Sequence, residues 1–128
     1  MQVGPKVCLI NKYSASDGDL FPWGFRALGL GKLIGTRTWG GIVGISGSLP
    51  YMDGTDIRVP FFTSFDPKTG SWIIENHGVD PDILIDNDPV KEWNGEDQQL
   101  DRAIQEVMKE LQNRKPLPGV PTPRDFSK

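Results

Sequence analysis

Ser16 is the residue of this chain whose type and position could most directly do chemistry. The apolar run at residues 7–10 predicts a buried strand, and a helix-like segment begins directly after Ser16. Where a strand gives way to a helix through a tight turn, the free N–H groups and the positive end of the helix dipole can stabilise a developing oxyanion. A serine at such a corner is therefore a candidate nucleophile.

The side chains around this corner also have purely structural interpretations. Ser16 can simply cap the helix that begins at Asp17, since serine is among the best N-cap residues. Asp17 and Asp19 look like catalytic carboxylates, but acidic residues in the first turn of a helix more often stabilise its dipole. Ser14 lies on the same turn and is the alternative nucleophile. The local pattern leaves these alternatives open.

Three sequence blocks narrow the choice. They are Ser-Ala-Ser-Asp-Gly-Asp at residues 14–19, Leu-Gly-Lys-Leu-Ile-Gly-Thr-Arg-Thr-Trp-Gly-Gly at 30–41 and Glu-Asn-His-Gly-Val-Asp-Pro-Asp at 75–82. In this order they resemble the end of the catalytic domain of tricorn-type serine peptidases, which are relatives of the carboxy-terminal processing proteases. The resemblance spans residues 4–112, and it favours Ser16 over Ser14 as the nucleophile.

This resemblance implies a fold and a set of site residues. The fold is α/β, with a crotonase-like βαβ core, a β-hairpin and a C-terminal helix, present here as an incomplete domain. Ser16 would be the nucleophile, the backbone N–H of Asp17 an oxyanion-hole donor, and Glu75 the acidic member of the catalytic group. Gly44 and Ile45 would offer a strand edge on which substrate pairs by β-augmentation. The alternative for this glycine-rich stretch is a merely bent strand.

The general base is the missing member of this group. In tricorn-type enzymes the catalytic histidine comes from a segment well upstream of the nucleophile, whereas only 15 residues precede Ser16 here. A Ser/Lys dyad is disfavoured because Gly41 stands where the processing proteases have their lysine. For His77, which follows Glu75 in a turn, an exposed loop histidine is the better interpretation. The chain is therefore interpreted as the carboxy-terminal piece of a larger peptidase.

Two functions of different class follow. The first is the nucleophile-bearing part of a tricorn-like serine peptidase that hydrolyses peptide bonds through an acyl-enzyme, with its base supplied by the upstream part of the same peptidase. The second is a non-catalytic assembly or peptide-binding module, inactive in isolation. The expected partners are peptide substrates, that upstream part and further copies of the chain. The expected compartment is the cytoplasm, or an exported location if the parent carries a signal peptide.

The composition argues against several other classes. The 128 residues suit one ordinary domain, and four Trp with six Phe provide material for a core. A net charge of −3 gives no basic patch for nucleic acid, and no apolar stretch reaches the roughly 20 residues that span a bilayer. One Cys and one His are too few for a structural zinc site. No metal and no cofactor are expected, and Cys8 is predicted to be a buried structural thiol.

The remaining elements are predicted from patterning. Residues 5–11, 17–28 and 32–36 should form a parallel βαβ unit, with some irregularity at Pro22. Residues 55–65 and 71–75, joined by the turn at 66–70, predict a β-hairpin that ends at Glu75.

The end of the chain predicts one helix and a tail. Residues 86–95 should be a loop, and the last helix should begin near residues 95–97. Its apolar stripe is expected to pack into the core; the stripe comprises Leu100, Ala103, Ile104, Val107, Met108 and Leu111. Residues 1–115 are assigned to the catalytic domain and residues 116–128 to a Pro-rich extended tail.

Overall fold

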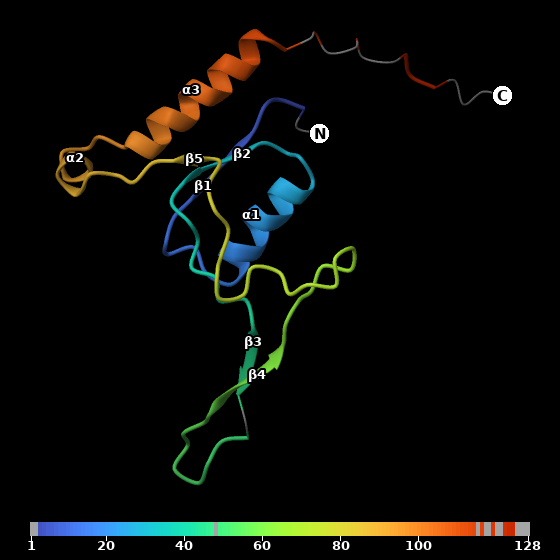
Figure 1. The fold of residues 1–128 in the computed structure, drawn as a ribbon, viewed down its shortest axis with the longest axis vertical. Helices are drawn as coiled ribbons and strands as arrows, with labels where there is room; N and C mark the ends of the chain where they lie inside the picture. Colours follow the sequence, from blue (N-terminus) through green and yellow to red (C-terminus); the bar gives the residue numbers. More distant parts are fainter. Residues whose placement is uncertain (1–2, 48, 115, 117–118, 120–121, 125–128) are drawn as a thin grey trace.

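A parallel three-stranded sheet forms the centre of the computed structural model, which describes residues 3–47, 49–114, 116, 119 and 122–124 (Figure 1). The strands lie in the order β1 (Val7–Ile10), β2 (Lys32–Gly35) and β5 (Ile83–Leu84). Both neighbouring pairs are parallel. The predicted βαβ unit is confirmed, because α1 (Asp17–Ala27) connects β1 to β2. The chain is thus α/β, as expected.

α1 follows its sequence pattern closely. Leu28 caps its end, and Gly29 follows with a φ of 62°, the left-handed conformation that glycine adopts without a steric penalty. The expected irregularity at Pro22 is wrong, since the helix continues through this residue. The Pro22 side chain is fully buried, and burial of its ring offsets part of the cost of the missing N–H donor.

Alternate residues of a strand point to opposite sides of the sheet, so both faces of this sheet carry apolar side chains. One helix packs on each face. On the α1 face lies the buried core cluster of Ile10, Phe25, Leu33 and Val79. Cys8 packs against this cluster and is half-buried, and burial raises the pKa of its thiol. A raised thiol pKa means little thiolate at neutral pH, which is consistent with a structural cysteine.

α3 (Gln98–Gln112) covers the other face and is anchored by a salt bridge. Glu106 is only 4% exposed, and its carboxylate accepts a hydrogen bond from Lys32 Nζ at 2.6 Å and pairs with Arg102 at 2.7 Å. The hydrogen bond from Lys32 lowers the pKa of Glu106, and the same contact raises the pKa of Lys32. The pair therefore ties the last helix to the middle strand of the sheet.

The predicted core packing of the α3 stripe is wrong for most of its residues. Ala103 is buried, but Leu100, Ile104, Met108 and Leu111 are between 41% and 53% exposed. Much of this stripe, together with the outward-facing residues of β1, lines an open apolar groove of about 290 Å³. The stripe faces the sheet as its periodicity predicts, yet the described residues leave its outer side open because β1 is an edge strand.

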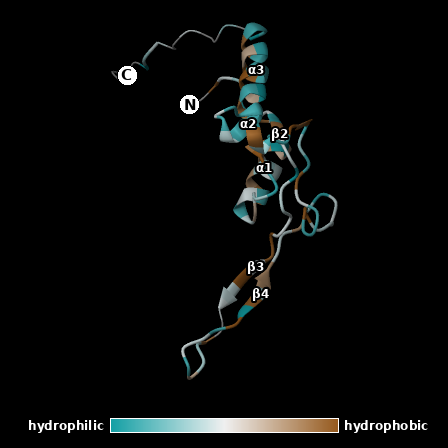
Figure 2. Ribbon diagram, turned by 90° about the vertical axis from the view of Figure 1, so that its left-hand side faces the viewer, coloured by the Kyte–Doolittle hydropathy of each residue, from teal (hydrophilic) through white to brown (hydrophobic). Residues whose placement is uncertain are grey.

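A two-stranded antiparallel ribbon projects away from the sheet (Figures 1 and 2). It consists of β3 (Gly44–Gly47) and β4 (Arg58–Phe62). The predicted pairing of residues 55–65 with 71–75 is largely wrong, since only an isolated Phe65–Trp72 bridge joins them beside the turn at 66–70. β4 pairs with β3 instead, where Gly44 has no Cβ and so leaves room for the Phe62 ring.

The stretch predicted as a loop contains a short helix, α2 (Pro89–Trp93). The Asp88 carboxylate caps it by accepting hydrogen bonds from Val90 N and Lys91 N, and Pro89 occupies the first helical turn. Most of the predicted tail at residues 116–128 lies outside the described residues. Among the helices that the structure describes, none has the length and apolar character needed to cross a membrane.

Candidate active site

Ser16 occupies an unusual backbone conformation at the start of α1. Its φ is 54° and its ψ is −111°, and a positive φ is uncommon for a residue with a Cβ. Its hydroxyl makes no capping hydrogen bond to the helix. The capping interpretation is therefore wrong, and the exposed side chain is free for another role. Strained residues of this kind are concentrated at functional sites.

The alternative nucleophile, Ser14, is used within its own turn. Its Oγ accepts a hydrogen bond from Asn11 N at 3.2 Å, and its carbonyl accepts one from Trp39 N at 2.9 Å. Asp17 is the first residue of α1, so its N–H has no acceptor within the helix. The corner thus combines an unbonded serine hydroxyl with a backbone donor on the next residue.

Ser16 lines a groove of about 500 Å³ that also contains most of the other predicted site residues. Glu75, Gly44 and Ile45 line it as well, although they come from distant parts of the chain. Sequence reasoning missed the remaining lining residues, which are Trp39, Gly41, Val43 and Phe62. Only the glycine density of residues 40–47 and the aromatic residues near them hinted at these positions. The groove is therefore a mainly apolar channel with a serine and a carboxylate.

Glu75 lies in a tight turn instead of at the end of a strand. Its neighbours Ile74 and Asn76 both have positive φ values, of 35° and 61°, and this conformation is strained for a β-branched residue such as isoleucine. Glu75 Oε2 accepts hydrogen bonds from Ile42 N at 2.7 Å and from Val43 N at 3.0 Å. The carboxylate thus fixes the backbone of residues 42–43, which lead into β3.

β3 offers a strand edge at this groove. It has β4 as its one neighbour in the two-stranded sheet, so its other edge is available for pairing. The ladder is irregular between Gly44 and Ile45, which pair with Phe62 and Pro60 respectively. The irregular register agrees with the bent-strand interpretation, and Gly44 and Ile45 line the same groove as Ser16. Substrate pairing on this edge stays a prediction.

His77 is not among the residues that line the Ser16 groove. Its Nε2 lies 2.8 Å from Asp80 Oδ2, and both side chains are more than half exposed. The described residues that line the Ser16 groove include no histidine and no lysine. The exposed-loop interpretation of His77 agrees with this placement.

Asp19 is buried and does more than complement the helix dipole. Its side chain is 0% exposed, and its oxygens accept hydrogen bonds from Gly40 N at 2.7 Å and Gly41 N at 3.2 Å. The Ser-x-x-Asp spacing resembles a capping box, in which the acidic side chain would return to its own helix terminus. Here it binds the glycine segment instead.

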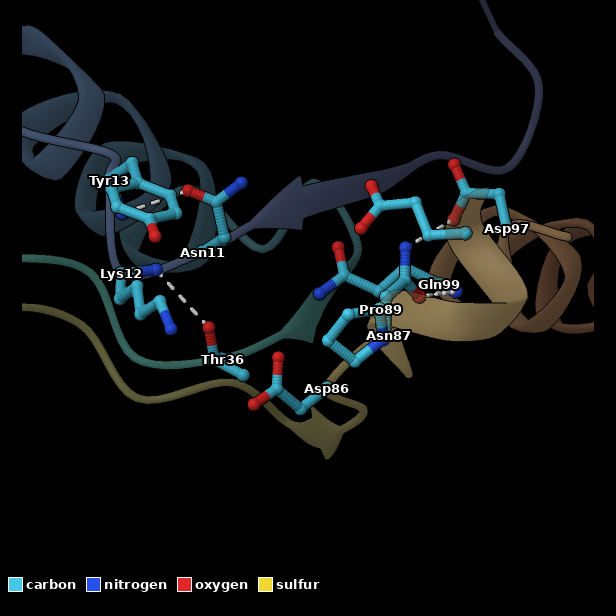
Figure 3. Close-up of a pocket in the computed structure, with 10 residues that line it drawn as sticks. Asn11, Lys12, Tyr13, Thr36, Asp86, Asn87, Pro89, Asp97 and Gln99 are labelled. Carbon is cyan, nitrogen blue, oxygen red and sulfur yellow. Dashed lines mark hydrogen bonds between the residues drawn. The ribbon is translucent and has the colours of Figure 1, made fainter. Parts of the chain in front are cut away.

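A second, polar cavity lies at the carboxyl ends of the parallel strands (Figure 3). Its lining residues bind one another: Lys12 N donates to Thr36 Oγ1, Asn87 Nδ2 donates to Asp97 Oδ1, and Asp97 caps α3. Gln99 Nε2 also donates to Ile85 O, so hydrogen bonds among these residues hold the start of α3 against the segment that follows β5. No cluster of three or more potential metal ligands occurs within the described part of the chain.

Comparisons with known proteins show the family of this chain. A family model for peptidase family S41 matches residues 2–85. The tricorn protease of Thermoplasma acidophilum is 46% identical over 110 residues, which are 86% of this chain and 10% of that protein. A putative tricorn-like protease C-terminal subunit of Sulfurisphaera tokodaii is 42% identical over 87% of this chain and 13% of its own length. A crystal structure of the tricorn protease superposes with a TM-score of 0.76 at 46% identity, covering 84% of this chain and 10% of that one. The chain spans about a tenth of the length of these relatives.

Proposed function

Because this chain belongs to peptidase family S41, we propose that it carries the nucleophile of a tricorn-like serine peptidase. Its α/β core would be the crotonase-like core of the catalytic domain, comprising residues 1–115. One observation carries the proposal. Ser16 has a strained backbone, and its hydroxyl does not cap α1. It lies in one groove with Glu75 and with Gly44 and Ile45 of the β3 edge strand.

The proposed reaction proceeds through an acyl-enzyme. Ser16 Oγ attacks the carbonyl carbon of the scissile peptide bond and transfers its proton to a general base. The backbone N–H of Asp17, at the positive end of the α1 dipole, donates to the oxyanion. The leaving amine takes the proton from the base as the C–N bond breaks. Water then hydrolyses the acyl-enzyme by the same route and restores Ser16.

The base comes from outside the described groove, in the preceding part of the peptidase. Glu75 uses Oε2 for both of its backbone hydrogen bonds. Its Oε1 is then the atom that would orient a protonated base, as the acid does in a Ser-His-Asp triad.

The substrate is a peptide in extended conformation. It would add to β3 at Gly44 and Ile45 by β-augmentation, with backbone hydrogen bonds giving affinity and the groove giving side-chain preference. The apolar groove between β1 and α3 is the surface that further protein would cover, either the preceding part of the peptidase or another copy of the chain. We expect a soluble, cytoplasmic or exported enzyme.

A second function is favoured by one observation, the lack of a histidine or lysine among the described groove residues. Without a base, a serine hydroxyl is a weak nucleophile at neutral pH. The chain by itself would then act as a peptide-binding or assembly module that uses the same β3 edge.

Active-site labelling with a fluorophosphonate, read by intact mass, separates the two functions. The chain is tested alone and after addition of the preceding part of the Thermoplasma acidophilum tricorn protease. Labelling that needs the added part, is lost in Ser16→Ala and persists in Ser14→Ala is the expected result. Labelling of the chain alone that is lost in His77→Ala would assign the base to His77. No labelling in either sample, with retained peptide binding, would favour the binding module.

A further inference from the structure

The six backbone N–H groups of residues 38–43 are all used in hydrogen bonds, and the last four of them go to two carboxylates. Thr38 N donates to Val79 O, and Trp39 N donates to Ser14 O. The next two N–H groups donate to Asp19, and those of Ile42 and Val43 donate to Glu75. This segment joins the strand after the nucleophile helix to the substrate edge of β3. Its path is therefore set by α1, by the turn that carries Glu75, and by backbone bonds to Ser14 and Val79.

Asp19 occupies the most buried position in this arrangement. It lies one turn after Ser16 in α1 and is 0% exposed. A buried carboxylate is costly unless its oxygens accept hydrogen bonds, and bonds to an ionised acceptor are stronger than neutral ones. Two oxygens of Asp19 receive two consecutive N–H groups. α1, which begins directly after Ser16, thus also holds the backbone at Gly40 and Gly41.

Gly40 links Asp19 to the turn that carries Glu75 through two hydrogen bonds made by its backbone. Its N–H binds Asp19, while its carbonyl accepts a hydrogen bond from Asn76 N at 2.7 Å. Gly40 has a φ of 88°, and a Cβ there would meet Gly78 N at 2.4 Å. Only glycine fits this close approach of two backbone segments. Asp19 is therefore connected through Gly40 to the turn that carries Glu75, and the segment that it holds continues through residues 41–43 into β3.

We propose that Asp19 is a positioning residue for the peptidase reaction. By holding the N–H groups of Gly40 and Gly41, it fixes the β3 edge and the Glu75 turn relative to Ser16. This inference rests on the proposed function. Its consequence is that loss of the carboxylate misplaces the Glu75 turn, and the base that Glu75 orients, relative to Ser16. Displacements of about 1 Å can cost on the order of 10²-fold in rate.

Asp19→Asn is the test, with Asp82→Asn as the matched control. Asp82 is also a carboxylate that accepts a backbone hydrogen bond, from Leu33 N at 2.7 Å, and it pairs with Arg26, but its hydrogen bonds do not involve residues 38–43. Asp19→Asn keeps the size of the side chain. It replaces one of the two acceptor oxygens with an amide NH2 group, which cannot accept a hydrogen bond from Gly40 or Gly41. Three quantities are measured on each variant: amide hydrogen exchange by NMR, the urea midpoint, and the fluorophosphonate labelling rate in the reconstituted peptidase.

The expected result is selective. In Asp19→Asn, the amides of Gly40 and Gly41 should exchange roughly tenfold faster relative to those of Leu33 and Ile34. The labelling rate should fall on the order of 10²-fold, while Asp82→Asn labels at the wild-type rate at equal stability. A uniform increase of exchange across the core, or an unchanged labelling rate, would overturn the positioning role. If the wild-type chain is not labelled at all, the proposed function fails, and exchange at Gly40 and Gly41 still decides whether Asp19 holds this corner.

Discussion

The corner around Ser16 and the β3–β4 ribbon are built in opposite ways, although both contribute to the same groove. At the corner, consecutive N–H groups bind the buried carboxylate of Asp19 and the partly exposed one of Glu75, and the core residues Leu33 and Ile34 are 0% exposed. In the ribbon all five residues of β4 are exposed, including Phe61 at 77%. Figure 2 shows these apolar strands extending away from the rest of the molecule.

This difference indicates which part of the site is preorganised by the chain itself. A two-stranded ribbon is at best marginally stable alone, because it has no core of its own. The nucleophile corner is over-determined by hydrogen bonds and packing. We therefore interpret the corner as the rigid half of the site and the ribbon as the half that substrate or another polypeptide completes.

Gly40→Ala should have the largest effect on stability. The new Cβ would overlap backbone atoms of residues 77 and 78, so we expect a loss of about 4 kcal/mol in the free energy of unfolding. Gly70→Ala is the control, because Gly70 has a similar φ of 68° but open space around its Cβ position, and about 1 kcal/mol is expected there. Urea unfolding measures both. Equal losses would mean that the corner is not tightly packed.

Leu33→Ala compares the two regions directly. Leu33 is fully buried in the α1 core, and we expect its truncation to cost about 3 kcal/mol. Phe61→Ala, in the ribbon, should change the free energy of unfolding by no more than about 0.5 kcal/mol. A cost at Phe61 as large as that at Leu33 would show that the ribbon packs against another surface in solution. It would contradict the interpretation of the ribbon as the less ordered half of the site.

Thr38→Val tests the hydrogen bonding of the corner without changing its shape. Thr38 is 3% exposed, and its Oγ1 accepts a hydrogen bond from Val79 N at 2.8 Å. The valine leaves this buried N–H without its side-chain acceptor, so we expect a loss of about 2 kcal/mol. Thr55→Val, in an exposed loop, is the control. An unaltered urea midpoint for Thr38→Val would show that the corner tolerates an unpaired donor.

The salt bridge under α3 should give the smallest effect, visible as a pH dependence. The pKa of Glu106 is lowered in the folded state by its hydrogen bond from Lys32. Its contribution is therefore present above the unfolded pKa of about 4.3 and is lost as the pH falls below it. Urea midpoints of Glu106→Gln should fall less between pH 6 and pH 3 than those of the wild type. Parallel curves for the two proteins would contradict this assignment.

Local patterns in the sequence determined much of the molecule. The apolar run, the small-residue turn and the helix after it predict the βαβ unit, because each signal acts within a few residues. The same corner offered Ser14 and Ser16 as nucleophiles. The family resemblance favoured Ser16 and implied Glu75, Gly44 and Ile45, and these four residues do line one groove. The Asp88-Pro89 pair is also a typical helix start, with an N-cap residue followed by proline in the first turn. A loop was nevertheless predicted there.

The tertiary structure alone decided which segments meet. A strand pattern does not specify its partner, so β4 pairs with β3 and not with residues 71–75. The period of α3 fixes which side is apolar, yet not how much of that side is covered. Asp19 has a helix-dipole position in the sequence, but its acceptors face Gly40 and Gly41, about twenty residues away in the chain. Contacts between distant segments depend on the whole arrangement of the backbone, which no local pattern contains.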